Sequence, residues 1–178
     1  MTQLMQGKRG LIMGLANDKS IAWGIARALA DAGAELALTY QGDQFRKRAE
    51  PLAAQLGVTE LHECDVTDED SLDAAFAALE KSWGKLDFYV HAIGFSDKGE
   101  LRGRYVDTSA DNFRSTMDVS VYSFTSCVRR AEKLMTDGGS CVTLTYYGAE
   151  RVMPHYNVMG VAKAALEASV RYLAEDLG

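Results

Sequence analysis

A tyrosine and a lysine in residues 143–163 have the types and the spacing to act on one ligand. Tyr156 and Lys163 are seven positions apart, so on a helix they would share one face, two turns apart. At about 1.5 Å of rise per residue their backbones would be roughly 10 Å apart. Tyr146, at the end of the preceding β-branched and aromatic run, is a third candidate. The same pattern also fits an aromatic residue and a lysine that reaches solvent from a half-buried helix.

The elements that must position these side chains alternate between strand and helix patterns. Such alternation is typical of a Rossmann-like α/β fold, a doubly wound parallel sheet with helices on both faces. Gly33 is expected to end the first helix, and Pro51 to kink the second or restart it. The predicted strands are residues 9–14, 34–40, 58–64, 86–93 and 140–146, and the predicted helices are residues 20–32, 43–56, 69–83, 110–135 and 157–177.

The 178 residues fit a single domain, and no internal repeat or linker marks a boundary within it. The sequence stops at Gly178, directly after the helix that carries Lys163. A doubly wound sheet usually continues through at least one more strand. We therefore expect the sequence to be C-terminally incomplete and to lack the last strands of its fold.

The turn after the first predicted strand could bind a phosphate group. Gly14 ends that strand, and a helix N-terminus with free amides follows, which favours an anion. Asn17, Asp18 and Ser20 are all suitable helix caps. The spacing GxGxxG is absent, since the next glycine is Gly24. An ordinary capped helix after a strand is the alternative interpretation.

Composition excludes several classes of function. A net charge of −6 without a basic stripe argues against nucleic-acid binding. Three scattered cysteines suit a reducing cytosol, and three scattered histidines give no support for a metal site. The first apolar run is too short for a signal peptide or a membrane span. The sequence therefore predicts a soluble, cytoplasmic protein that binds neither membrane nor metal.

Five segments, in order along the chain, resemble one known family. They are GLANDKSIAWGIA from Gly14, LTYQG at 38–42, CDV at 64–66, HAIGF at 91–95 and YYGAERVMPHYNVMGVAKAALEASVRYLA at 146–174. They look like the bacterial NADH-dependent enoyl-acyl-carrier-protein reductases, a divergent branch of the short-chain dehydrogenase/reductase family. Most short-chain dehydrogenases have lysine four positions after the tyrosine, where this chain has Gly160. The resemblance implies reduction of enoyl thioesters in fatty acid elongation.

The resemblance also implies where NADH would bind. Gly14, Ser20 and Ile21 would hold the pyrophosphate and its surroundings. Gln41 would face the adenosine ribose. Residues 40–42 contain no arginine to pair with a 2′-phosphate, which favours NADH over NADPH. Arg46 and Lys47, further along, weaken this preference slightly.

The remaining cofactor contacts implied by the resemblance follow the later strands. Asp65 and Val66 would bracket the adenine, although Asp65 could also serve as a turn or cap residue. Ile93 and Gly94 would approach a ribose of the cofactor, with the glycine admitting close backbone contact. Lys163 would donate hydrogen bonds to the nicotinamide ribose.

In that family's chemistry Tyr156 would donate a hydrogen bond to the enolate oxygen that forms during hydride transfer. The Lys163 ammonium and the nicotinamide charge are expected to lower the tyrosine pKa. Tyr146 could position the acyl group or the hydroxyl network, or simply wall the pocket. Tyr147 is expected on the other side of the strand. His155 is interpreted as a surface or packing residue rather than as an acid–base group.

Two predicted helices, residues 110–135 and 157–177, are apolar over a wide surface and need burial on more than one face. The resemblance implies a homotetramer packed through helices and an acyl carrier protein as the substrate's carrier, while a C-terminal segment could also cover part of this surface. Two alternatives remain open. One is a non-catalytic NAD-binding module or inactive fragment, and the other is a carbonyl-reducing short-chain dehydrogenase.

Overall fold

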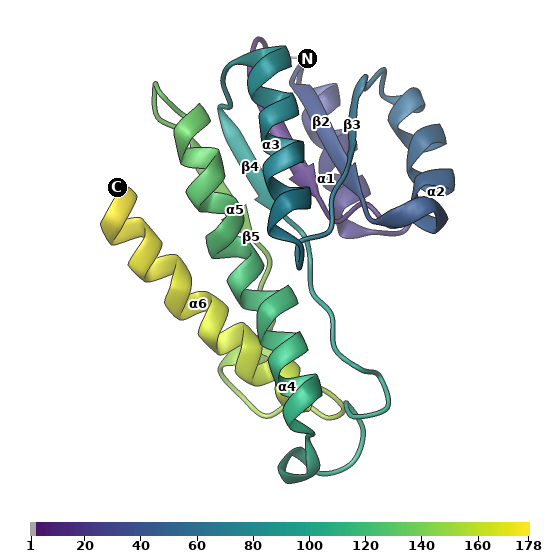
Figure 1. The fold of residues 1–178 in the computed structure, drawn as a ribbon, viewed down its shortest axis with the longest axis vertical. Helices are drawn as coiled ribbons and strands as arrows, with labels where there is room; N and C mark the ends of the chain where they lie inside the picture. Colours follow the sequence, from purple (N-terminus) through teal and green to yellow (C-terminus); the bar gives the residue numbers. More distant parts are fainter. Residues whose placement is uncertain (1–2) are drawn as a thin grey trace. The chain divides into compact units, whose positions relative to one another are not determined.

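One parallel sheet organises the computed structural model, which describes residues 3–178 (Figure 1). Its order is β3-β2-β1-β4-β5, and all four pairings are parallel. The strands are β1 (Arg9–Met13), β2 (Glu35–Tyr40), β3 (Glu60–Glu63), β4 (Phe88–His91) and β5 (Ser140–Thr143). The order reverses between β1 and β4, and doubly wound sheets bind ligands beyond the carboxyl ends of the strands at such a point. The predicted fold class is confirmed.

Six α-helices connect or follow the strands of residues 3–178. They are α1 (Ile21–Asp31), α2 (Gly42–Gln55), α3 (Glu69–Trp83), α4 (Ala110–Met117), α5 (Ser123–Ala131) and α6 (Asn157–Leu177). Four short helical turns accompany them: η1 (Tyr105–Asp107), η2 (Asp118–Tyr122), η3 (Glu132–Leu134) and η4 (Tyr147–Ala149). The turn η2 is π-helical, and the other three are 3₁₀.

The chain divides into two compact units. The first, unit 1, comprises residues up to 92 together with residues 128–143, and it contains the whole sheet. The second, unit 2, comprises residues 93–127 and 144–178. It contains α4, η2, η4 and α6.

The sheet of unit 1 is covered on both faces, so most residues of its central strands β1, β2 and β4 are buried. Ile12 of β1, Leu38 of β2 and Val90 of β4 belong to one apolar cluster with α1 and α2. On the opposite face, Tyr89 packs its ring edge-on against Phe76 of α3, with 6.5 Å between centroids. In Figure 1, α3 lies in front of the sheet and α1 behind it. Side-chain alternation along each strand produces these two apolar faces.

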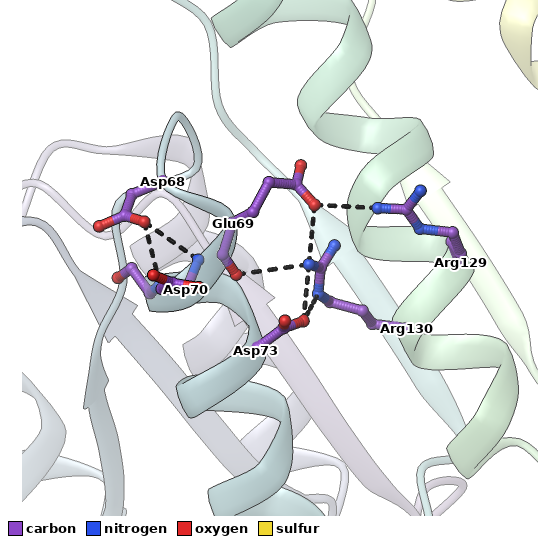
Figure 2. A network of polar contacts seen from close by, with 7 residues as sticks. Asp68, Glu69, Asp70, Asp73, Arg129 and Arg130 are labelled. Atoms are coloured by element: carbon purple, nitrogen blue, oxygen red, sulfur yellow. Dashed lines mark hydrogen bonds and ion pairs between the residues drawn. The ribbon is translucent and has the colours of Figure 1, made fainter.

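An ion-pair network joins α3 to the end of α5 within unit 1 (Figure 2). Arg130 is nearly buried, and its guanidinium reaches Glu69 Oε2 at 2.9 Å and Asp73 Oδ1 at 2.6 Å. Arg129 also pairs with Glu69, but its side chain is 55% exposed against 8% for Arg130. Asp68 caps α3 by accepting from the backbone N–H groups of Asp70 and Ser71.

Capping residues and glycines in the sequence predicted the ends of α1 and α3 correctly. The helix α3 has the predicted bounds, with Asp68 as its cap and Gly84 in the left-handed region at its end. The helix α1 ends at Asp31, and Gly33 follows with a φ of 95°. The predicted stop at Gly33 is therefore confirmed.

Other predicted boundaries are wrong. Pro51 lies inside α2, which continues across it. The helix therefore does not restart there, and the alternative of a kink at Pro51 stays a prediction. Burial of Ala49, Leu52 and Ala53 offsets the hydrogen bond that a proline forfeits. The predicted helix of residues 110–135 is divided by the π-helical turn η2 and ends in the 3₁₀ turn η3.

The strand β5 ends at Thr143, earlier than predicted, because its partner β4 ends at His91, which pairs with Thr143. Tyr146 therefore lies beyond the strand, and Tyr147 begins η4. The expected strand alternation of these two tyrosines does not apply.

Within residues 3–178, no helix is long and apolar enough to cross a membrane. The same residues bring together no group of three or more His, Cys, Asp and Glu side chains that could hold a metal ion.

Candidate functional site

The turn after β1 leads into a helix whose N-terminus lacks a side-chain cap. Gly14 has a φ of 103°, a conformation that favours glycine. Ser20 occupies the N-cap position of α1 without a capping hydrogen bond, and its hydroxyl donates to the carbonyl of Asn17 at 2.6 Å. The Asn17 side chain accepts from Lys19 N at 2.8 Å. The expected capping is thus wrong for Asn17 and Ser20, whose side chains bond within the turn.

That arrangement suits an anion. The first turn of α1 carries no acidic residue, and an uncapped helix N-terminus favours negative charge. Ile21, the first residue of the helix, is 67% exposed. A large apolar side chain in this position can contact a bound ligand rather than the core.

Two predicted residues after β2 and β3 meet within unit 1. Gln41 donates from Nε2 to Asp65 Oδ2 at 2.9 Å. The other carboxylate oxygen of Asp65 accepts from the backbone N–H and the hydroxyl of Thr67, at 2.9 and 2.7 Å. Asp65 is therefore a turn residue, as its alternative interpretation predicted. Val66, beside it, is half-buried.

The Asp65 carboxylate is stabilised in its charged form. Partial burial acts to raise the pKa of this carboxyl, but the hydrogen bonds from Thr67 and Gln41 outweigh it and hold the pKa below its ordinary value. At neutral pH the group is a hydrogen-bond acceptor.

Lys163 lies on the buried side of α6 in unit 2. It is 7% exposed, and its ammonium donates to the carbonyl oxygen of Leu144 at 2.8 Å. Burial lowers the pKa of Lys163. An ammonium has three N–H donors, so two remain for a ligand or water.

Gly94 lies close to that ammonium. A Cβ placed on Gly94 would be 3.7 Å from Lys163 Nζ and 3.8 Å from Ser120 Oγ. These are ordinary contact distances, so the chain itself leaves room for a side chain there. Ile93 is half-buried beside it.

Ser120 was not predicted from the sequence, and it fixes the backbone next to Gly94. Its hydroxyl accepts from Phe95 N at 3.0 Å and donates to Phe95 O at 3.1 Å. The residue is fully buried and lies in the π-helical turn η2. Turns of this kind occur often at functional sites.

Tyr156 stands at the N-cap of α6 and not within it, so the predicted shared helical face with Lys163 is wrong. Its ring packs edge-to-face on Tyr146, with 4.9 Å between centroids. A Cβ on Gly148 would lie 2.4 Å from the Tyr156 ring, so glycine is required for this approach. Among residues 3–178, the Tyr156 hydroxyl has no hydrogen-bond partner, which leaves it available to a ligand.

The pKa of Tyr156 is raised, first by burial and then by the neighbouring Tyr146. The sequence analysis expected the Lys163 ammonium and the nicotinamide charge to lower this pKa. In the protein alone the Lys163 ammonium binds Leu144 O and does not lower it. The Tyr156 hydroxyl is therefore protonated at neutral pH and able to donate a hydrogen bond.

The predicted residues fall into two groups, one in each unit. Those in unit 1 are Gly14, Ser20, Ile21, Gln41, Asp65 and Val66, and those in unit 2 are Ile93, Gly94, Tyr146, Tyr156 and Lys163. Contacts join Gln41 to Asp65 in the first group and Tyr146 to Tyr156 in the second.

A parallel sheet of this order, with a glycine turn and an uncapped helix after β1, defines a Rossmann-like protein of the nucleotide-binding type. Residues 14–178 match the family model described as enoyl-(acyl carrier protein) reductase, and the chain belongs to that family. The resemblance seen in the sequence is confirmed.

Individual relatives agree with this assignment. Two proteins of Rhizobium meliloti (strain 1021), enoyl-acyl-carrier-protein reductases (NADH) 1 and 2, are 71% and 63% identical over 98% and 100% of this chain. The chain spans 64% and 66% of their lengths. A solved reductase of Anaplasma phagocytophilum, in complex with NAD, is 61% identical with a TM-score of 0.98, and the match covers 100% of this chain and 68% of that one.

Proposed function

We propose that the full-length protein reduces the trans-2 double bond of enoyl thioesters carried by acyl carrier protein, with NADH as the reductant. The observation that carries this proposal is the position of Tyr156, at the N-cap of α6 and packed on Tyr146, in a member of the enoyl reductase family. Its hydroxyl has no protein hydrogen-bond partner among the described residues. The relatives named above are NADH-dependent enoyl reductases, which supports the choice of reaction.

The chain's own residues fit a dinucleotide. We assign the pyrophosphate to the uncapped N-terminus of α1, with Gly14, Ser20 and Ile21. Gln41, Asp65 and Val66 would contact the adenosine part. NADH is favoured over NADPH because no arginine occurs at 40–42.

The nicotinamide part would belong to residues of unit 2. Lys163 has two N–H donors beyond the one bound by Leu144, and these would bind the ribose hydroxyls. Ile93 and Gly94 would lie against the same ribose, where Gly94 leaves space beside the ammonium. When bound, NADH would supply a hydride.

Tyr156 would act on the charge that develops in the substrate. Addition of hydride to the β-carbon breaks the carbon–carbon π bond and moves its electrons onto the thioester oxygen. A hydroxyl aimed at that oxygen stabilises the transition state more than the ground state. The overall reaction consumes one hydride and one proton, and saturates the α- and β-carbons. Tyr146, packed on Tyr156, would hold the ring in place or wall the acyl site.

Assembly is part of the proposal. Exposed apolar side chains occur on α4, η2 and α6, among them Phe113, Tyr122, Val161 and Val170. Burying such side chains would stabilise a complex, and we propose a cytoplasmic homotetramer that uses these helices.

The test is an assay of NADH oxidation by the full-length protein with crotonyl thioester, in which the product is identified by mass. Formation of the saturated butyryl thioester supports the proposal. Turnover of a β-ketoacyl thioester in its place would identify a carbonyl-reducing dehydrogenase. NADH binding without turnover of either would identify a non-catalytic module.

A further inference from the structure

Tyr156 lies between two residues with unusual backbone conformations. His155 has a φ of 58° and Asn157 a φ of 34°, and they are the non-glycine residues of positive φ in residues 3–178. Asparagine and histidine adopt this region more readily than most residues, but each such conformation is still unfavourable. A conformation of this kind persists only where surrounding contacts impose it.

Asn157 supplies such a contact. Its side-chain amide donates to the carbonyl oxygen of Glu100 at 3.0 Å and, at 3.5 Å, to that of Gly103. Both acceptors belong to residues 97–104 of unit 2, which are part of the loop that comes after β4 in the chain. His155 is exposed, and its side chain makes no hydrogen bond within the described part of the chain.

The loop that receives Asn157 is itself anchored to α4. The Glu100 carboxylate accepts from the backbone N–H and the hydroxyl of Ser109, at 2.8 and 2.7 Å, and from Asn112 Nδ2 at 3.3 Å. The hydrogen bonds from Ser109 are the main reason that the pKa of Glu100 is lowered. Asn112 is buried, and its Oδ1 accepts from Asp97 N at 3.0 Å. Asn157 therefore binds an ordered segment.

We propose that Asn157 is a positioning residue for Tyr156. Its amide holds residues 155–157 against the loop, and this keeps the Tyr156 ring on Gly148 and beside Tyr146. Asn157 touches neither substrate nor cofactor in this account. The inference rests on the proposed catalytic role of Tyr156, and it adds a group that no resemblance in the sequence assigned.

Three substitutions in the full-length protein separate the effect of the Asn157 amide hydrogen bonds from the effect of the positive φ at His155 and Asn157. Asn157→Gly permits positive φ but removes the amide, and Asn157→Asp keeps the shape but replaces the two donors by a carboxylate. His155→Gly is the matched control, because it relieves positive φ at the other neighbour and removes no hydrogen bond. Circular dichroism and thermal unfolding check that each variant folds.

Both Asn157 variants should lower kcat for crotonyl thioester reduction by about tenfold or more, since small misplacements of a catalytic group are costly. The KM for NADH should change less than twofold, and His155→Gly should match the wild type. The NMR signal of ¹³Cζ-labelled Tyr156, assigned with Tyr156→Phe, should shift in both Asn157 variants and stay in place in His155→Gly.

Wild-type kcat together with an unmoved Tyr156 signal in the Asn157 variants would overturn the positioning role while leaving the proposed function intact. Absence of wild-type turnover would instead overturn the proposed function. In that case the Tyr156 signal alone decides whether Asn157 holds the tyrosine.

Discussion

The ammonium of Lys163 donates to the main-chain carbonyl of Leu144 across 2.8 Å, which ties the buried side of α6 to the residue that follows β5 in the chain. A lysine buried to this degree needs a polar partner, and here the partner is a neutral carbonyl. The ammonium keeps two further donors, and its direction is fixed by the backbone that it binds.

Replacing Lys163 with alanine should weaken NADH binding by about tenfold to 100-fold, since a hydrogen bond from a charged donor contributes about 1.5–3 kcal/mol. Cofactor fluorescence measures the Kd. Lys133→Ala, a change at an exposed lysine of η3, is the control. Equal Kd values for Lys163→Ala and the control would contradict the anchor role.

Ser120→Ala should reduce both stability and cofactor affinity, because it removes the hydroxyl that binds Phe95 N and O. Loss of a buried partner costs about 1–3 kcal/mol in the free energy of unfolding. Ser169→Ala is matched to it, because within residues 3–178 that hydroxyl bonds only to Ala165 O, one turn back in α6. Urea denaturation and NADH titration give the two readouts, and equal values for both variants would argue against a role for Ser120.

The ion-pair network in Figure 2 predicts that the two adjacent arginines contribute unequally to the free energy of unfolding. Arg130→Met should lower the free energy of unfolding by about 2 kcal/mol, because Arg130 is nearly buried and pairs with both Glu69 and Asp73. Arg129→Met should cost less than about 1 kcal/mol, as exposed pairs do. Urea unfolding of both variants tests this order, and the reverse order would refute it.

The lowered pKa of Asp65 predicts that the free energy of unfolding depends on pH. Because its folded-state pKa lies below the ordinary 3.8, its stabilising effect is present above pH 3.8 and is lost as the pH falls through the lower folded-state value. The stability difference between wild type and Asp65→Asn should therefore be largest near neutral pH and shrink below 3.8. Urea midpoints across this range measure it, and a constant difference would count against the prediction.

Much of unit 1 followed from local signals in the sequence. The bounds of α3 depend on Asp68 and Gly84, which lie at its two ends, so a short window contains what determines them. No short window determines the end of β5, because residues 143–147, Thr-Leu-Thr-Tyr-Tyr, continue a strand pattern past Thr143. The end of β5 is set by the end of β4, 52 positions away in the chain, through the pairing of His91 with Thr143.

The candidate site was predictable in its residues more than in its geometry. Helical periodicity placed Tyr156 and Lys163 on one face, but the positive φ of His155 and Asn157 puts Tyr156 outside the helix. Ser120 carried no signal in the sequence, because its hydroxyl binds the backbone of Phe95, which is 25 positions away. The contact of Gly148 with the Tyr156 ring could not be predicted from the sequence either, because the two residues are brought together only by the fold of residues 144–157.

The central claim is that the Tyr156 hydroxyl donates to the developing enolate oxygen, and steady-state reduction of crotonyl thioester by Tyr156→Phe tests it most directly. Loss of one such donor costs about 100-fold or more in kcat, while NADH affinity should stay as in the wild type because Lys163 and the α1 turn are unchanged. A large fall in kcat with unaltered Kd for NADH is the predicted result. A Tyr156→Phe protein with wild-type kcat would contradict the account.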